Sequence, residues 1–306
     1  MVTKIIINEH FHGSDTDQRN IVDYLEKIRR NAVLNTENEL KLSDLINSNY
    51  IRDDLFQEAI GKFSNSINQI HKFELLNPNR YYIMIPESGI GGFYGMPVGG
   101  FDHYKAIGRT TLLSRDLIKS DFLITLELAR NYLHDCIHHC TFKSYSWNRE
   151  KEEAYRYQYG INYRSLNGIS YSSPTLSDKS PLGINLNVLM DGFTQYYLSL
   201  FFKNNIHTRE PIKNPYEFAV LEELFYMNLL HGYSEPIKYY KEVLTPTKVF
   251  LEYWGHDFLI PEILFAMLSG NSVKLKEYFS IKLNRKDAWE SLFRQPLFTE
   301  LGLNLS

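Results

Sequence analysis

The segment SDFLITLELARNYLHDCIHHC (120–140) constrains the fold more than any other part of the chain. Its apolar residues recur at alternating spacings of four and three, which predicts a helix. They are Phe122, Leu126, Ala129, Leu133, Cys136 and Cys140. Ser120 or Asp121 is suited to cap the first turn. We therefore expect a helix whose surface is largely buried.

Two histidines interrupt this apolar helix on one side. His134 and His138 are four residues apart, so they project in the same direction and can coordinate one ion. Glu127 and Asn131 extend the same polar stripe toward the start of the helix. Buried or half-buried imidazoles need partners, and one cation would supply a partner to both.

The residues from His134 to His138 read His-Asp-x-x-His, with Asp135 directly after the first histidine. In the HExxH arrangement of metallopeptidases, two histidines on one helix face bind zinc and the intervening acid is the general base. Aspartate is one methylene shorter than glutamate. Asp135 could serve as the base if the helix lies closer to the metal-bound water or if a second water relays the proton.

A catalytic zinc usually takes three protein ligands and keeps a fourth position for water. The best candidate for the third ligand is Asp191, an isolated acid within the apolar segment INLNVLMDGFTQYYLSLFF (184–202). This segment predicts a buried helix, in which an unpaired acid is costly. Gly192 would permit a close approach of another helix.

These residues resemble a known family. HDCIH, followed 53 residues after His138 by the Asp-Gly-aromatic-Thr-Gln-Tyr run that starts at Asp191, resembles the gluzincin-type HExxH zinc metallopeptidases. The resemblance covers roughly residues 80–202, with GRTTLLS (108–114) in the place of the family's edge strand. Both acids are Asp where the family has Glu.

The resemblance implies an α+β, zincin-like fold: a small mixed sheet with the active-site helix, followed by a mainly helical lobe. It implies Zn²⁺ held by His134, His138 and Asp191, with Asp135 as general base and a peptide or protein as substrate. The oxyanion that develops during hydrolysis needs a further donor. We expect that donor to be His231, Tyr196 or Tyr197.

Two other hypotheses remain open. HD-domain phosphohydrolases use a distant His, an adjacent His-Asp pair and a later Asp as metal ligands, and His103, His134, Asp135 and Asp191 could imitate that set. The third hypothesis is a non-catalytic binding protein, either a zincin-like protein without activity or an unrelated helical module. Asp135 separates the two enzyme classes, because it is a base in the peptidase and a ligand in the phosphohydrolase.

The rest of the chain predicts one catalytic unit made of two lobes. Residues 1–165 form a mixed α/β lobe, and residues 166–306 form a helical lobe that supplies the third ligand. Further helices are expected over 17–33, 55–73 and most of the chain after 216, and strands over 3–7 and 80–86. The glycine-rich stretch 87–104 predicts a long turn or flap, and 142–186 a packed irregular loop rather than a lid or substrate wall.

Composition excludes several classes of protein. The net charge of −3 gives no basic field for nucleic acid. No apolar run reaches the roughly 18 residues of a membrane span, and the first residues lack the apolar stretch of a signal peptide. Two cysteines four apart on a helix do not form a disulfide. We expect a cytoplasmic protein, or one exported without a cleavable signal peptide, such as an effector. The oligomeric state cannot be predicted.

Overall fold

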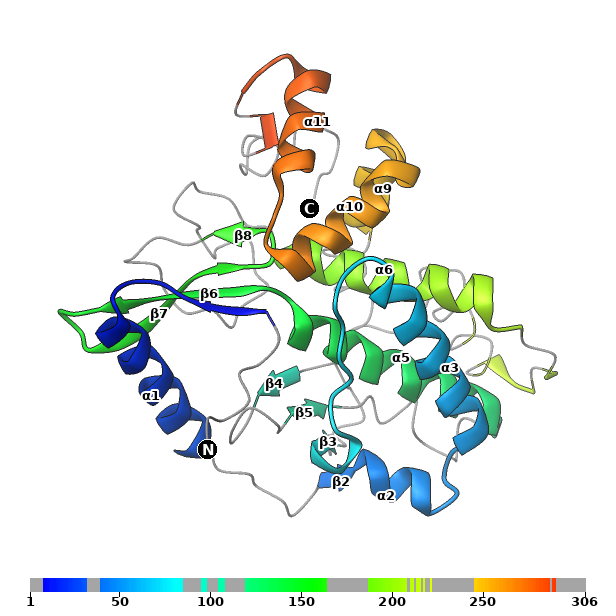
Figure 1. Cartoon of the computed structure of the whole chain (residues 1–306). Coiled ribbons are helices and arrows are strands. Elements are labelled where there is room, and N and C mark those ends of the chain that lie inside the picture. The colour runs from blue at the N-terminus through cyan, green and yellow to red at the C-terminus, as the bar shows by residue number, and fades with distance from the viewer. Residues whose placement is uncertain are drawn as a thin grey trace.

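The computed structural model describes residues 8–31, 39–84, 95–97, 104–107, 119–163, 187–207 and 245–286, with isolated positions at 210–211, 213–215, 217, 221 and 288–289. The described chain has a mixed α+β architecture (Figure 1). Its helices are α1 (Asp15–Asn31), α2 (Leu42–Asn47), α3 (Asp53–Asn68), the 3-10 helix η1 (Pro78–Arg80), α5 (Asp121–Cys140), α6 (Asn187–Asn205), α9 (Thr245–Trp254), α10 (His256–Ser269) and α11 (Val273–Leu283). Its strands are β1 (Glu9–Phe11), β2 (Glu39–Lys41), β3 (Tyr81–Met84), β4 (Gly95–Pro97), β5 (Tyr104–Ile107), β6 (Lys143–Asn148), β7 (Glu153–Tyr159) and β8 (Asn162–Tyr163).

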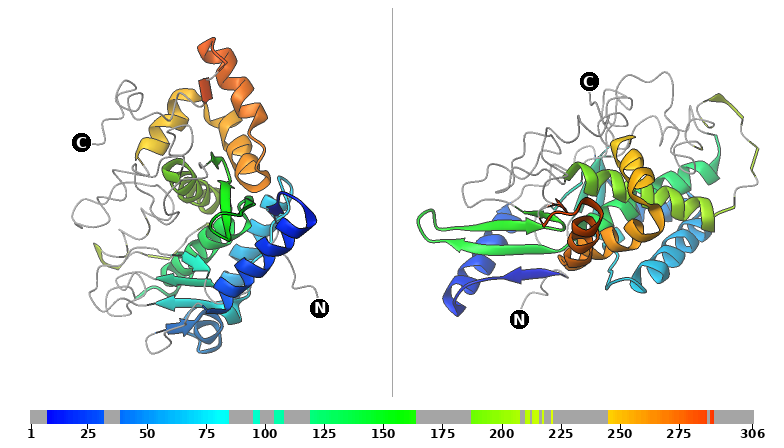
Figure 2. Two further views of the ribbon diagram at one scale, coloured as in Figure 1. Left: turned by 90° about the vertical axis from the view of Figure 1, so that its left-hand side faces the viewer. Right: turned by 90° about the horizontal axis from the view of Figure 1, so that it is seen from above.

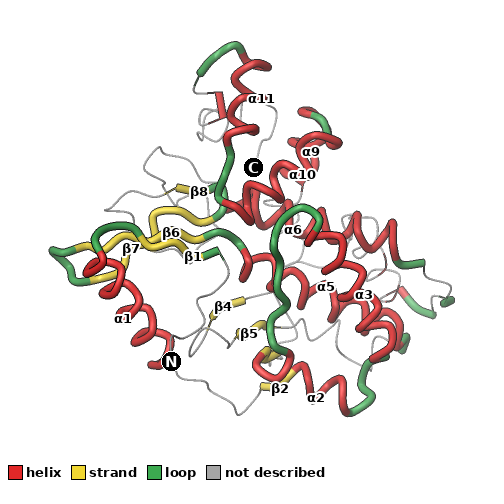
Figure 3. Tube along the Cα trace, viewed as in Figure 1, coloured by secondary structure: helices red, strands yellow, loops and turns green. Residues whose placement is uncertain are grey.

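The strands form two small sheets (Figure 3). One has the order β1-β6-β7-β8, with β1 parallel to β6 and the other neighbours antiparallel. The second has the order β2-β3-β5-β4, in which β3 and β5 are parallel and each outer strand is antiparallel to its neighbour. The second sheet is therefore mixed, and its strand β3 contacts helix α5 through Tyr81.

Helices α3, α5 and α6 pack against one another and form the main core (Figures 1 and 2). Phe63 of α3 meets Tyr197 and Phe201 of α6 edge to face, and Phe56 of α3 packs on Tyr132 of α5. Aromatic contacts of this kind bury large areas and fix how the helices are rotated. The α5–α6 pair is thereby held at one relative orientation.

Helix α5 begins where the sequence predicts. Ser120 is its N-cap, and the side-chain hydroxyl accepts a hydrogen bond from the backbone N–H of Leu123. The fully buried carboxylate of Glu217 accepts from the backbone N–H groups of Lys119 and Ser120. Negative charge at a helix N-terminus is favourable, so a distant part of the chain stabilises the start of this helix.

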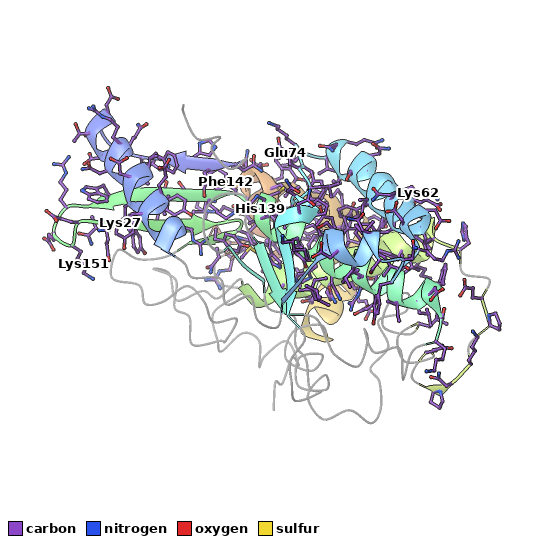
Figure 4. The ribbon with its side chains drawn as sticks, turned by 90° about the horizontal axis from the view of Figure 1, so that it is seen from below. Lys27, Lys62, Glu74, His139, Phe142 and Lys151 are labelled. Carbon is purple, nitrogen blue, oxygen red and sulfur yellow. The ribbon has the colours of Figure 1, made fainter. Side chains whose placement is uncertain are left out.

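The junction after α5 is tightly packed. The backbone N–H of Phe142 donates to the carbonyl of Met267 in α10, and Gly270, which ends α10 at φ +72°, lies against the Phe142 ring. A side chain at position 270 would clash with that ring. His139 and Phe142, labelled in Figure 4, mark the passage from α5 into β6. The chain directly after α5 is thus held against the end of α10.

Several sequence predictions are confirmed. The central helix is predicted over 120–140 and spans Asp121–Cys140, and the next is predicted over 184–202 and spans Asn187–Asn205. Helices expected over 17–33 and 55–73 are α1 and α3, each with ends a few residues earlier. Cys136 and Cys140 are buried free thiols of the core.

The prediction of an irregular loop over 142–186 is wrong for its first part. Residues 143–163 form β6, β7 and β8, and Figure 4 shows the β6–β7 hairpin reaching away from α3, α5 and α6, with α1 beside it and Lys151 at its tip. Tyr155, Tyr157 and Tyr159 alternate with polar residues, which is the spacing of a strand. Gly160 lies in the turn between β7 and β8, whereas Asn148 and Asn162 belong to the strands, so these residue types were a poor guide to the loops here.

The glycine-rich stretch also contains structure, because residues 95–97 form strand β4 and Tyr104 opens β5. The strands expected over 3–7 and 108–114 lie outside the described residues, as does the lobe boundary expected at 165/166. Three of the expected late helices are described as α9, α10 and α11. Within the described part of the chain, no helix combines the length and apolarity that crossing a membrane requires.

Candidate metal centre

The two histidines of α5 and the acid of α6 meet at one point. Nε2 of His134 and Nε2 of His138 each lie 3.3 Å from the same atom, Oδ1 of Asp191. The two imidazole rings have centroids 4.6 Å apart. Among the described residues, these three are the group whose ligand atoms all lie within 4.8 Å of one another. We call His134, His138 and Asp191 the central cluster.

Helix spacing explains why the residues converge. His134 and His138 stand one turn apart on α5. Asp191 and Gln195 stand one turn apart on the facing helix α6, so both point toward α5. The far face of α5 carries Cys136 and Cys140, whose sulfurs accept backbone N–H groups of Leu76 and Glu74.

Each imidazole is held through its other ring nitrogen. Nδ1 of His134 lies 2.9 Å from the amide oxygen Oε1 of Gln195. Nδ1 of His138 lies 3.1 Å from the hydroxyl of Tyr159 in β7, and that hydroxyl also donates to the His138 carbonyl at 3.2 Å. Both rings therefore present Nε2 to Asp191.

Nε2 of His138 is buried and has no hydrogen bond. It lies 3.3 Å from a carboxylate oxygen, but the geometry of that contact is not that of a hydrogen bond. A buried polar atom without a hydrogen bond is costly and calls for an explanation. The Asp191 side chain keeps 23% of its exposure, so a small ion can reach this point.

The charges of the central cluster are coupled. Burial alone lowers the pKa of His134, but Asp191, Asp135 and Gln195 together outweigh burial and raise the pKa. Burial also lowers the pKa of His138, and here burial and the neighbouring His134 prevail over Asp191. Burial alone raises the pKa of Asp191, but His134 and His138 together hold that pKa well below its usual range. Asp191 is thus a carboxylate, and positive charge beside it is favourable.

Asp135 does not belong to the central cluster. It is 2% exposed, and its Oδ2 accepts a 2.5 Å hydrogen bond from the hydroxyl of Tyr81 in β3. Its charge is close enough to raise the pKa of His134. The acid of the motif is therefore a carboxylate beside the three candidate ligands and is tied to the second sheet.

The structure places the expected oxyanion donors elsewhere. The hydroxyl of Tyr196 lies 3.1 Å from Nδ1 of His256 in α10, and the ring of Tyr197 packs on Phe63 of α3. In the described part of the chain, neither tyrosine hydroxyl is hydrogen-bonded to a residue of the central cluster. His231, the third candidate, and His103, the distant histidine of the phosphohydrolase hypothesis, lie outside the described residues.

The polar stripe on α5 has a second component that the sequence analysis missed. Arg130 is fully buried, and its guanidinium binds Glu127 through two hydrogen bonds of 3.0 and 2.6 Å. The side-chain amide of Asn131 contacts the same carboxylate. Glu127 and Asn131 therefore belong to an ion-pair network one turn before the central cluster.

Three further residues around the site were also missed. A helix-spacing argument could have found Gln195, since it follows Asp191 by one turn. The strand alternation of residues 155–159 could have suggested Tyr159. Tyr81 has no local signal, because its contact with Asp135 joins residues 54 positions apart.

Two of the three donor–donor distances in the central cluster suit a small tetrahedral ion. Zinc bonds to nitrogen and oxygen are about 2.05 Å long, and a tetrahedron with such bonds has edges of about 3.3 Å. The distances from Nε2 of His134 and Nε2 of His138 to Oδ1 of Asp191 are both 3.3 Å. Octahedral Mg²⁺ with bonds of similar length would set neighbouring donors about 2.9 Å apart. Two nitrogen donors and one oxygen donor are a ligand set typical of zinc.

Comparisons with family models, with curated proteins and with solved structures find no match to this chain. The geometry and chemistry of the central cluster are therefore the basis for a functional proposal.

Proposed function

We propose that the protein is a zinc-dependent hydrolase and, by its resemblance to the gluzincin-type peptidases, one that cleaves peptide bonds. The supporting observation is the meeting of two Nε2 atoms and one carboxylate oxygen, with Nε2 of His138 buried and not hydrogen-bonded. A cation between these atoms would satisfy all three at once.

The ligand set supports zinc, and it leaves room for a reaction. Two histidines and one acid are the protein ligands of several zinc peptidases, in which the fourth position holds water. Bound zinc would lower the pKa of that water to about 7 and polarise a substrate carbonyl. Because the central cluster keeps part of its exposure, water and a substrate could approach it.

The chain's own residues take three roles in this proposal. His134, His138 and Asp191 hold the ion. Asp135 takes the proton of the attacking water and passes it to the leaving amine. The hydroxyl of Tyr81 holds the Asp135 carboxylate in place, which makes Tyr81 a positioning residue.

The zincin-like fold is part of the same proposal. In support, the helix with both histidines adjoins a small mixed sheet through the Tyr81–Asp135 contact, and the third ligand comes from the next described helix. The residues that form the central cluster also favour a peptidase over a phosphohydrolase. It includes His138, which has no role in the phosphohydrolase hypothesis, and it omits Asp135, which would be a ligand there.

Metal analysis and peptide cleavage test the proposal together. The wild type is expected to carry one zinc per chain and to cleave a library of quenched fluorescent peptides. Asp135→Asn should keep the zinc and lose about 10² to 10⁴ of the rate, since a positioned general base contributes that much. Asp121→Asn, at the exposed start of α5, is the matched control and should change neither.

Three outcomes would contradict the proposal in different ways. Loss of zinc in Asp135→Asn would make this residue a ligand, as in the phosphohydrolases. Stoichiometric zinc without any hydrolysis would indicate a non-catalytic zinc protein. A wild type that binds no zinc would exclude a zinc-dependent activity altogether.

A further inference from the structure

Gln195 and Tyr159 are the two side chains that hold the imidazoles of the central cluster from behind. Each contacts Nδ1, the ring nitrogen that faces away from Asp191. They come from different elements, α6 and β7, and neither contact follows from the HDxxH pattern. A neutral imidazole carries one proton, so the partner of one nitrogen decides the state of the other.

At His134 the partner is the amide oxygen of Gln195, 2.9 Å from Nδ1. A carbonyl oxygen can only accept, so this contact favours the form of the ring in which Nδ1 carries the proton and donates it. Gln195 is buried and Thr194, its neighbour on α6, is bonded to its own helix through the Met190 carbonyl. The amide oxygen of Gln195 thus lies against His134 inside the core, and a ring with its proton on Nδ1 keeps the Nε2 lone pair for the central cluster.

At His138 the partner is a hydroxyl with one proton to give. Tyr159 donates that proton to the His138 carbonyl at 3.2 Å, so its oxygen can accept from Nδ1 at 3.1 Å. The tyrosine ring is fixed in turn by two cations, the Arg156 guanidinium 4.9 Å and Lys143 Nζ 5.7 Å from the ring centre. This contact likewise favours the form of His138 with the proton on Nδ1 and the lone pair on Nε2.

We propose that Gln195 and Tyr159 are positioning residues that set both histidines in the Nδ1–H form and thereby tune the affinity of the central cluster for zinc. This inference rests on the proposed zinc site. It also predicts the direction of each effect. A stronger acceptor at Nδ1 of His134 raises the basicity of Nε2 and strengthens zinc binding, and loss of that acceptor weakens zinc binding.

Two substitutions at position 195 are expected to act in opposite directions. Gln195→Glu replaces the amide oxygen with a carboxylate that can only accept, and the dissociation constant for zinc should fall by about tenfold. Gln195→Met keeps the volume and removes the acceptor, and the same constant should rise by about 10- to 100-fold. A purely structural role would weaken zinc binding in both variants, because both disturb a buried residue.

Tyr159→Phe should weaken zinc binding by about tenfold, since Nδ1 of His138 loses its acceptor. The matched controls are Tyr157→Phe, on the same strand but bonded to His12, and Thr194→Val, next to Gln195 on α6. Both should leave zinc affinity within about twofold. Competition with a chromogenic chelator measures the affinities, and melting of each metal-free variant shows whether it is folded.

A second measurement does not depend on zinc. In metal-free protein at high pH, the ¹⁵N spectra of the histidine rings distinguish Nδ1–H from Nε2–H forms. The wild type should show Nδ1–H for both His134 and His138, and Gln195→Met should lose this preference at His134 alone. A wild type with Nε2–H rings, or a Gln195→Glu variant that binds zinc more weakly than the wild type, would overturn the inference. A wild type with Nδ1–H rings that binds no zinc would instead contradict the proposed function and the zinc-tuning part of this inference, while leaving the tautomer assignment intact.

Discussion

Two histidine sites in the described part of the chain differ in how the imidazole Nε2 atoms are bonded. In the central cluster, two Nε2 atoms face one carboxylate oxygen at 3.3 Å. At the start of the first sheet, Nε2 of His12 already has two hydroxyl partners, Ser144 at 2.7 Å and Tyr157 at 2.6 Å. We call His12, Ser144 and Tyr157 the His12 group.

The difference shows what separates a metal site from a hydrogen-bonded histidine. Hydroxyl groups can donate to the lone pair of His12 and satisfy it, so no ion is needed there. A carboxylate cannot donate, so in the Nδ1–H form that we propose the Nε2 lone pairs of the central cluster face an acceptor. The number of histidines therefore does not distinguish a metal site from a hydrogen-bonded histidine. The distinction lies in whether a hydrogen-bond donor faces the lone pair of Nε2.

The largest expected effect comes from removing the shared carboxylate. Asp191→Ala should lower zinc affinity by well over about a hundredfold, because the loss of a ligand must exceed the 10- to 100-fold cost of losing an outer partner. His12→Ala removes a histidine of the other site and should leave zinc affinity unchanged. Isothermal titration with zinc measures both. A similar loss in the two variants would mean that the comparison is unfounded.

Removal of the metal is expected to have the next largest effect, and only through the central cluster. Free zinc at 100 times its dissociation constant stabilises the folded protein by about 2.7 kcal/mol. Chelation should therefore lower the melting temperature by several degrees, as followed by circular dichroism. Asp191→Ala should melt at the same temperature with and without the chelator, whereas His12→Ala should respond as the wild type does. A chelator shift that persists in Asp191→Ala would place the metal elsewhere.

A smaller effect is expected from the His12 group. Ser144 is 1% exposed, and Ser144→Ala removes one of the two partners of His12. The free energy of unfolding should fall by about 1 kcal/mol, the usual net value of one hydrogen bond, as measured by urea denaturation. Zinc affinity should not change; a change would show that the two sites are coupled through β6 and α5.

The smallest effect concerns an ion pair next to the His12 group. Hydrogen bonds from Arg149 and Ser14 lower the pKa of Asp17 to about 2. Because the folded pKa lies below the unfolded value of about 3.9, this carboxylate stabilises the fold above pH 4 and the contribution is lost as pH falls from about 4 to about 2. Arg149→Met should raise the pKa of Asp17 toward 3.8 in an NMR titration. An unchanged pKa would assign the shift to Ser14 alone.

Much of the central region could be predicted from the sequence because its signals are local. The spacing of four between His134 and His138 fixes a shared face wherever a helix forms. The burial cost of Asp191 in an apolar helix indicates that a partner must exist. The structure brings these three residues together, and whether they hold zinc stays a prediction.

The rest depends on contacts between distant residues, which single-sequence patterns do not encode. Tyr81 meets Asp135 across 54 positions, and Tyr159 meets His138 through the hairpin that was predicted as an irregular loop. Tyr196 follows Asp191 by only five residues, yet it stands about 140° around α6 from that residue and bonds His256. Closeness along a helix is a poor guide unless the spacing is three or four.

The position of Asp191 on a separate helix also has a consequence for how the chain assembles. An ion held between His138 and Asp191 would close a loop of 53 residues (191 − 138) across the hairpin. Such a bridge can form only after α5 and α6 have docked, so the metal would enter late in folding and would oppose any separation of the two helices. A protease that attacks the stretch between them would then cut the metal-free chain faster than the loaded one.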